Sequence, residues 1–465
     1  MTVATKGVTR ALADYALTLE YESIPPAVIE RTKQLFLDFL GVAFGGHRVA
    51  ESTSPIVAAV RDLVCGARGA TTVVGEPDLY PPHYGALLNA TKAHSMDFDD
   101  THREAIMHPG APIFATLLAL AEEEGSSGKE FLAAAVAGYD VANKLGKAHG
   151  ASVHHRGFHP TATTGIFACT AAGARILKLP RDQAINALGL NSSQSAGSQQ
   201  FLINGAWNKR LHVGLAAHNA ILSLFMARRG FLGSAEPIEG AFGYFALYTN
   251  EPRDPAAALV GLGEDFEVLN TATKPYPCCR YSHAVIDAVT DLVRDNRLSS
   301  GDILRIEVQL GKTAYLIVGD SPEAKRKPSN VVEAQFSVYF AAAATVVSTF
   351  RWDSYETMHA PDVRALMERT TVEVASDLDG MASRTAIVTH DGRRLEREVP
   401  LPKGEPENPM SQAEAEAKFI EWTEPVLGPR KTQDLARQVA GLERLGTMAE
   451  LTRSLRLQAP STGRR

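Results

Sequence analysis

The stretch Phe131-Leu-Ala-Ala-Ala-Val-Ala-Gly138 carries no charged side chain. A second stretch, Thr163-Thr-Gly-Ile-Phe-Ala-Cys-Thr-Ala-Ala-Gly-Ala174, is nearly as apolar and just as rich in small residues. A helix that is apolar all round lies in the interior of a protein, and small side chains let such helices pack closely together. These two stretches therefore predict a helical domain with more than one layer.

The spacing of apolar residues extends this domain in both directions along the chain. Further helices are predicted at 26–40, 112–124, 128–147, 163–177 and 213–228. After Phe266 the pattern changes: residues 302–310 and 369–375 alternate like half-buried strands, and 386–399 is typical of a hairpin that turns at Asp391-Gly392. Helical stretches at 283–296 and 331–349 lie between the strands. We predict a mainly α protein with a large all-helical domain at 1–266, a smaller α+β domain at 267–402, and C-terminal helices at 403–465 that return to the helical domain.

Composition narrows the classes of partner. The formal net charge of -6 argues against a nucleic-acid-binding protein, because phosphate binding requires a basic surface. Four cysteines without zinc spacing predict neither a disulfide framework nor a zinc site. The N-terminus lacks the apolar segment of a signal peptide, and no apolar run is long enough to cross a bilayer. We therefore predict a cytoplasmic protein that acts on a small molecule and does not bind membranes.

Three short segments concentrate acids, imidazoles and cations. The first, His94-Ser-Met-Asp-Phe-Asp-Asp-Thr-His102, is followed closely by His108-Pro-Gly110. The second is Arg156-Gly-Phe-His-Pro160, and the third is Asn208-Lys-Arg-Leu-His212, just ahead of an apolar helix. Each has an alternative interpretation as a helix cap or a solvated turn. Their density in one domain favours acid–base chemistry on a bound anion.

A fourth segment, Lys274-Pro-Tyr-Pro-Cys-Cys-Arg-Tyr-Ser-His283, lies near the predicted domain boundary. Two prolines stiffen it, so its polar side chains are held on a rigid loop. Buried thiols are the expected state of Cys278 and Cys279, because a disulfide between neighbouring residues is strained.

Together, and in this order, these segments resemble the MmgE/PrpD family over nearly the whole chain. The family includes 2-methylcitrate dehydratase, cis-aconitate decarboxylase and iminodisuccinate epimerase. The resemblance implies a large helical domain, a smaller α+β lid, a homodimer, and chemistry beside a substrate carboxylate without a metal or other cofactor. By motif position it implies these active-site residues: Asp97, Thr101, His108, His159, Lys209, Lys274 and, in Gly311-Lys-Thr-Ala-Tyr315, Tyr315. We further expect Arg280, Cys279 and His212 to contact the substrate.

Departures from the family pattern bear on the reaction. Cis-aconitate decarboxylases carry a catalytic histidine where Cys279 aligns, and a thiol replaces that proton donor only if its pKa is lowered. The segment between Thr101 and His108 is shorter than the insertion of enterobacterial-type methylcitrate dehydratases, and His108-Pro-Gly replaces the more usual His-Pro-Ser. The sequence therefore favours a 2-methylcitrate dehydratase-like lyase that eliminates water from a hydroxy di- or tricarboxylate, and these departures leave the exact substrate open.

Three alternatives stay open. Epimerisation of a dicarboxylate begins with the same removal of a proton α to a carboxylate, and it differs only in the face to which a proton returns. Decarboxylation of a cis-aconitate-like acid is the second alternative. The third is a family member that binds a carboxylate without turning it over.

Overall fold

The structure is a computed structural model that describes residues 7–66 and 69–457. The chain divides into two compact units. Unit 1 comprises the described parts of 1–200, 207–271 and 411–465, and unit 2 comprises 201–206 and 272–410. Among the described residues, no helix is long and apolar enough to cross a membrane.

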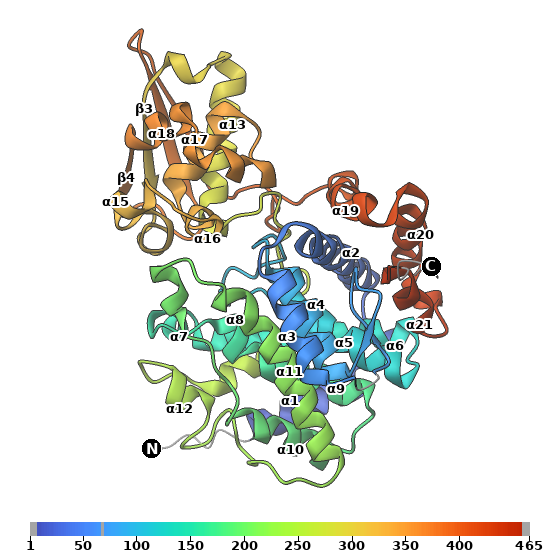
Figure 1. The fold of residues 1–465 in the computed structure, drawn as a ribbon. Helices are drawn as coiled ribbons and strands as arrows, with labels where there is room; N and C mark the ends of the chain where they lie inside the picture. Colours follow the sequence, from blue (N-terminus) through green and yellow to red (C-terminus); the bar gives the residue numbers. More distant parts are fainter. Residues whose placement is uncertain (1–6, 67–68, 458–465) are drawn as a thin grey trace. The chain divides into compact units, whose positions relative to one another are not determined.

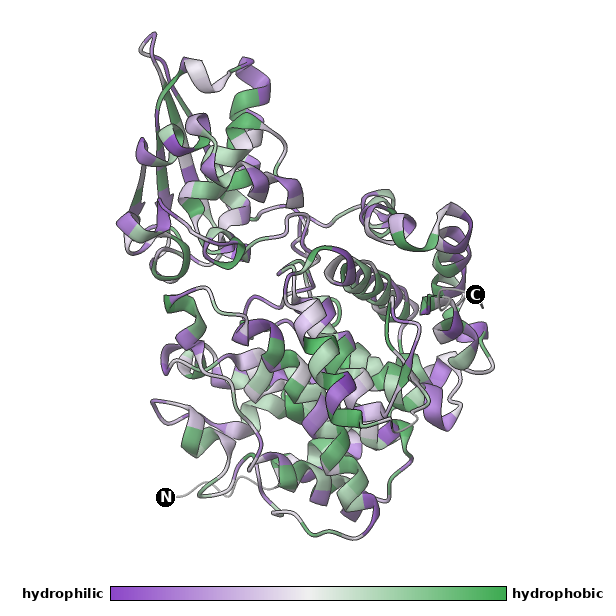
Figure 2. Cartoon of the chain, in the orientation of Figure 1, coloured by the Kyte–Doolittle hydropathy of each residue, from purple (hydrophilic) through white to green (hydrophobic). Residues whose placement is uncertain are grey.

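Unit 1 is built almost entirely of helices (Figure 1). Among the central ones, α5 and α9 contact each other and both α6 and α11, and the middle of this group is largely green, the hydrophobic colour, in Figure 2. Its elements are α1 (Val8–Thr18), α2 (Pro26–Val49), α3 (Thr53–Val64), β1 (Thr71–Thr72), β2 (Leu79–Tyr80), α4 (Pro82–His94), α5 (Gly110–Glu124), α6 (Gly128–His149), α7 (Ser152–His155), α8 (Pro160–Thr163), α9 (Gly165–Ile176), α10 (Arg181–Asn191), α11 (Asn208–Arg228), α12 (Tyr244–Tyr248), α19 (Gln412–Leu427), α20 (Pro429–Ala440) and α21 (Ala449–Thr452).

Small residues explain how the central helices of unit 1 approach one another. A side chain placed at Gly138 of α6 would lie 3.1 Å from the Cβ atom of Ala172 in α9 and 3.1 Å from Ile113 in α5. The start of α6 is equally well specified, because Ser127 and Glu130 form a capping box. The predicted layered helical domain is thus confirmed.

Unit 2 packs helices against a four-stranded sheet with the order β4-β3-β5-β6. β3 pairs in parallel with β4 and antiparallel with β5, and β5 pairs antiparallel with β6. Helix α13 contacts β5 and β6, while α17 contacts β4. The elements are α13 (His283–Asn296), β3 (Ile303–Leu310), α14 (Lys312–Ala314), a π-helix (Tyr315–Gly319), α15 (Pro322–Lys325), α16 (Val331–Gln335), α17 (Val338–Val347), α18 (Pro361–Glu368), β4 (Thr370–Val374), β5 (Ser383–Thr389) and β6 (Arg394–Val399).

The strands lie where their alternating pattern predicts them, and the mainly α fold with a smaller α+β part is confirmed. Two helix predictions need correction. The segment 331–349 is two helices, because the chain bends at Phe336-Ser337 and Ser337 caps α17. Helix α11 begins at Asn208 rather than Val213, so Lys209 and His212 belong to its first turns and do not form a turn ahead of it.

The unit boundaries differ by a few residues from the predicted domain boundaries at 266 and 402. Glu267 belongs to unit 1 because its backbone N–H donates to Asp140 of α6 at 2.7 Å. Glu405 belongs to unit 2 because its carboxylate accepts two hydrogen bonds from Arg280.

Candidate active site in unit 1

The acidic segment leaves helix α4 through a tight turn. Helix α4 ends at His94, and the N–H of Asp97 donates to the His94 carbonyl at 3.1 Å. Asp97 has φ of 51°, in the left-handed region that few residues other than glycine adopt. Met96 is fully buried, with its sulfur beside Gly45 of α2. The turn thereby separates the apolar side chain from the carboxylates of Asp97 and Asp99, which reach imidazoles.

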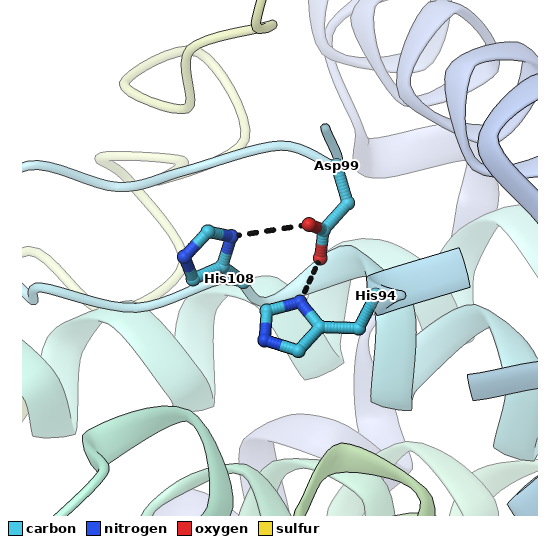
Figure 3. A group of neighbouring side chains, drawn as sticks. All are labelled: His94, Asp99 and His108. Atoms are coloured by element: carbon cyan, nitrogen blue, oxygen red, sulfur yellow. Dashed lines mark hydrogen bonds and ion pairs between the residues drawn. The ribbon is translucent and has the colours of Figure 1, made fainter. Parts of the chain in front are cut away.

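Asp99 lies between two imidazoles, with one carboxylate oxygen directed to each (Figure 3). Its Oδ2 is 2.8 Å from Nδ1 of His94, and its Oδ1 is 3.3 Å from Nδ1 of His108. The ring centroids of the two histidines are 4.6 Å apart, edge to face. Asp99 and His94 are almost completely buried, whereas 13% of the His108 side chain is exposed. Asp99 therefore fixes the orientation of both rings.

Asp97 joins this group to the first turn of α11. The ammonium of Lys209 donates to Oδ1 of Asp97 at 2.5 Å, and Nε2 of His108 lies 3.7 Å from the same oxygen. His108 is thus flanked by one carboxylate at each ring nitrogen, which stabilises positive charge on the ring. The group combines a cation, two carboxylates and an imidazole, as proton transfer beside an anionic substrate requires.

Two more imidazoles join the group, one from the residue that precedes α8 and one from α11. The ring of His159 stacks on that of His94 with centroids 5.7 Å apart. Its Nδ1 lies 3.4 Å from Nδ1 of His212, which projects from α11. Thr161 accepts the backbone N–H of His108 at 3.1 Å. Through this contact the segment at 159–161 also positions His108.

Burial and neighbouring charges shift the pKa values of three imidazoles and of Asp99. Burial, reinforced by nearby Lys209 and His94, holds the pKa of His159 well below its usual range. Burial also lowers the pKa of His212 to about 4 and that of His94 below its ordinary value, although Asp99 opposes the shift at His94. Burial acts to raise the pKa of Asp99, but the charges of His94 and His108 outweigh it and hold that pKa well below the ordinary value. Near neutral pH, an ionised Asp99 therefore faces a neutral His94, and the His159 ring is neutral as well.

The pKa of Asp100 rises to about 7, mainly because the carboxyl group is buried. Its oxygens accept hydrogen bonds from Tyr139 at 2.5 Å and from the N–H of Gly110 at 3.0 Å. Between about pH 4 and pH 7 the folded protein holds a proton here that the unfolded chain has released. The stability associated with this proton is present at low pH and is lost as the pH rises through 7, an effect on the order of a few kcal/mol.

Asp100→Asn is therefore expected to reduce the fall in melting temperature between about pH 5 and about pH 8. The amide is neutral at every pH, accepts from Gly110 as the acid does, and donates to the Tyr139 oxygen. Thermal unfolding at matched ionic strength measures the effect, with Asp62→Asn on the exposed face of α3 as the control. Parallel curves for the wild type and Asp100→Asn would show that Asp100 is ionised in the folded protein throughout this range.

Unit 1 thus brings together five of the predicted residues, namely Asp97, His108, His159, Lys209 and His212. Thr101 lies on the same segment and is buried. The remaining four, Lys274, Cys279, Arg280 and Tyr315, belong to unit 2.

In unit 2, the guanidinium of Arg280 donates to Glu405, to the carbonyl of Lys403 and toward His283. These contacts hold its own loop, and its contact with a substrate stays a prediction. The N–H of Cys279 donates to the Gln335 carbonyl at 2.9 Å, and Cys278 and Cys279 are both buried thiols outside any disulfide, as expected. Tyr315 begins the π-helix, a feature that often marks functional sites.

The sequence prediction omitted His94 and Asp99 from the site. Both belong to the acidic segment, so the sequence does contain the signal, although the resemblance implies only Asp97 and Thr101 from this segment. Within the residues that the structure describes, Nε2 of His94 is buried without a hydrogen-bond partner. Since Nδ1 of His94 faces Asp99, this Nε2 is the unprotonated nitrogen of the neutral ring.

His94, Asp99 and His108 are also a ligand set that could hold a metal ion. One ligand atom from each lies within 4.8 Å of the others. Two imidazoles and a carboxylate suit a transition metal, and three protein ligands would leave coordination positions open. The same distances suit hydrogen bonds between Asp99 and the two rings. Chemistry without a metal stays a prediction.

Comparisons with known proteins cover almost the entire chain. The MmgE/PrpD N-terminal domain model matches residues 10–255, and the MmgE/PrpD C-terminal domain model matches residues 276–444. The cis-aconitate decarboxylase-like protein oryM of Aspergillus oryzae is 27% identical over 471 residues, which are 96% of this chain and 96% of that protein. Cis-aconitate decarboxylase of Aspergillus terreus is 27% identical over 478 residues, with the same coverage. The human cis-aconitate decarboxylase is 26% identical over 476 residues, or 98% of this chain and 96% of the human protein.

Proposed function

The chain belongs to the MmgE/PrpD family, and from that premise we propose that it is a lyase that decarboxylates a cis-aconitate-like unsaturated tricarboxylic acid. The observation that carries this proposal is the Lys209–Asp97–His108 group in a chain that matches cis-aconitate decarboxylases over 96% of its length. The relatives support this reaction better than the dehydration that the sequence favoured. At 26–27% identity they support a lyase of this family more strongly than any particular substrate.

The site residues fit the proton movements of such a decarboxylation. The bond between the substrate CH2 carbon and its carboxylate breaks, and the electron pair forms a new double bond as CO2 leaves. The electrons of the original double bond take up a proton at its far end. In this proposal the His108 imidazolium, stabilised by Asp99 and Asp97, supplies that proton. The ammonium of Lys209 stabilises the negative charge that spreads onto the neighbouring carboxylate.

Cys279 favours dehydration as the second candidate. It occupies the position at which cis-aconitate decarboxylases are expected to carry a histidine, so the protein lacks one proton donor of that reaction. In a dehydration, His159 is the neutral base that removes a proton α to a carboxylate. His108 then protonates the departing hydroxyl, and a double bond and water are formed. Epimerisation would share the first of these steps.

The homodimer that the family resemblance implies is part of this proposal. Leu215 and Leu222, seven residues apart on α11, are 38% and 43% exposed. Residues at this spacing lie on one face of a helix, so α11 presents two exposed leucines on the same side, where a second copy of the chain could cover them. Light scattering of the purified protein measures the oligomeric state.

Proton NMR in deuterated water tests the reaction. The purified protein is incubated with cis-aconitate, citrate, 2-methylcitrate, and hydroxy- and amino-dicarboxylates in turn. Loss of CO2 from cis-aconitate, seen as new methylene signals with deuterium at one carbon, would support the decarboxylase. New vinyl signals from a hydroxy acid would favour the dehydratase, and α-proton exchange without elimination would favour the epimerase. Binding without any turnover across the panel would refute a lyase and favour the non-catalytic carboxylate-binding protein.

A further inference from the structure

The six residues between Thr101 and His108 form a small hairpin. The N–H of His102 donates to the Met107 carbonyl at 2.8 Å, and the N–H of Met107 donates to the His102 carbonyl at 3.3 Å. His102 directly follows Thr101, and Met107 directly precedes His108. The geometry of this pair therefore determines how two candidate active-site residues lie relative to each other.

The hydrogen bonds of His102 identify its tautomer. The backbone N–H of Ala105 donates to Nδ1 of His102 at 3.2 Å, so Nδ1 is the unprotonated nitrogen of a neutral ring. The proton then lies on Nε2, which donates to Oε2 of Glu267 at 3.0 Å. Both side chains are 1% exposed. The Nδ1 atom of His102 thus closes the turn through Ala105. Its Nε2 atom connects the turn to Glu267, which lies 165 positions away in the sequence.

Glu267 is itself firmly held. Its carboxylate accepts from Lys147 at 2.9 Å and from Asn270 at 3.0 Å, and its N–H donates to Asp140 at 2.7 Å. Burial acts to raise its pKa, but the hydrogen bonds from His102, Asn270 and Lys147 outweigh it, so the pKa lies well below the ordinary value. Glu267 is therefore a fixed, ionised acceptor.

The hairpin also lies directly against helix α6, which carries Lys147 and Asp140. A Cβ atom at Gly146 would lie 2.3 Å from the Cβ atom of Ala105 and 3.1 Å from the sulfur of Met107. Only glycine allows this approach of the helix and the hairpin. Glu267 and Gly146 thus constrain the hairpin from two sides.

We propose that Glu267 is a positioning residue of the active site, which acts through His102 to hold Thr101 and His108 in their reactive arrangement. The proposal rests on the proposed function, since it takes Thr101 and His108 as residues that meet the substrate. Neither Glu267 nor His102 belongs to the group around Asp99 and Lys209. Displacing a reacting group by about 1 Å can lower a rate by about 10²-fold, so the contact matters although it is remote from the chemistry.

Two substitutions at the same position separate the two contacts of His102. In His102→Asn the amide lies where Nδ1 was and can still face Ala105, but it cannot reach Glu267. In His102→Gln the longer amide places a donor where Nε2 was, so the bond to Glu267 is kept. Hydrogen–deuterium exchange of peptides that cover 99–110 reports the hairpin without any substrate. Steady-state kinetics on the NMR-identified substrate reports kcat and KM.

We expect His102→Asn to exchange faster at the hairpin and to lose about 10- to 100-fold in kcat with little change in KM, while His102→Gln stays near the wild type in both. Equal losses in the two variants, or a His102→Asn enzyme with wild-type kcat, would overturn the proposal. If His102→Asn does not fold, Glu267→Met replaces it, because methionine offers no oxygen to accept the His102 N–H, with the same expected direction in both measurements. If the wild type turns over no compound, the proposed function fails, but hydrogen–deuterium exchange still decides whether Glu267 holds the hairpin. Faster exchange in His102→Asn but not in His102→Gln would support this role. Equal exchange in the two variants would refute it.

Discussion

Replacing His108 by glutamine is expected to lower kcat by about 10²- to 10⁴-fold, the usual contribution of a positioned acid or base. The glutamine amide reaches toward Asp97 as Nε2 does, but it carries no proton that it can transfer near neutral pH. The backbone contact with Thr161 is unaffected by the substitution, so the loop should keep its position. The expected loss is therefore one of proton transfer, seen in kcat from NMR progress curves with little change in KM.

His155→Gln is the matched control for this experiment. His155 lies at the end of α7, is exposed, and belongs to the same unit as His108. Its replacement should leave kcat unchanged. Wild-type kcat in His108→Gln, at an unchanged melting temperature, would remove His108 from the reaction and leave His94 or His159 as the proton-transferring group.

Local sequence patterns were sufficient for most elements of the fold. The apolar stretch at 131–138 predicts an interior helix because no face of it carries a polar residue, and the structure buries all of it in α6. The pair Asp391-Gly392 predicts the β5–β6 hairpin because a tight hairpin turn requires a positive φ, which glycine adopts readily. In the structure the φ of Gly392 is 88°. Both signals are confined to a few neighbouring residues, so they can be read without knowledge of the tertiary structure.

The arrangement of the site depended on contacts that no local pattern contains. Asp99 bridges His94 and His108 after a left-handed turn at Asp97, a backbone conformation that the sequence pattern does not predict. The pairing of His102 with Glu267 spans 165 residues and comes from the packing of two loops on α6. The sequence therefore identified the segments that carry the chemistry, but it could not say which acid serves which imidazole.

Replacing Lys209 by methionine is the second change with a large expected effect, a loss of about 10²- to 10³-fold in kcat. The methionine keeps much of the side-chain volume in the first turn of α11 but removes the cation that stabilises negative charge in the transition state. It also removes the ammonium that pairs with Asp97, whose side chain is 4% exposed, and leaves this carboxylate with the more distant His108, at 3.7 Å. Breaking a buried pair in this way typically costs about 3–5 kcal/mol of stability. Activity and stability should therefore fall together in this variant.

The double variant Asp97→Asn with Lys209→Met separates these two effects. It removes both charges, so the melting temperature should recover relative to Lys209→Met, because no unpaired buried carboxylate remains. The kcat should stay low, because the cation is still absent from the transition state. Lys178→Met serves as the control, since it removes a lysine whose side chain is 76% exposed from its pair with Glu130 and should change neither quantity. If kcat recovered with stability in the double variant, Lys209 would serve only to balance the charge of Asp97, and the cation that faces the substrate would have to come from another residue.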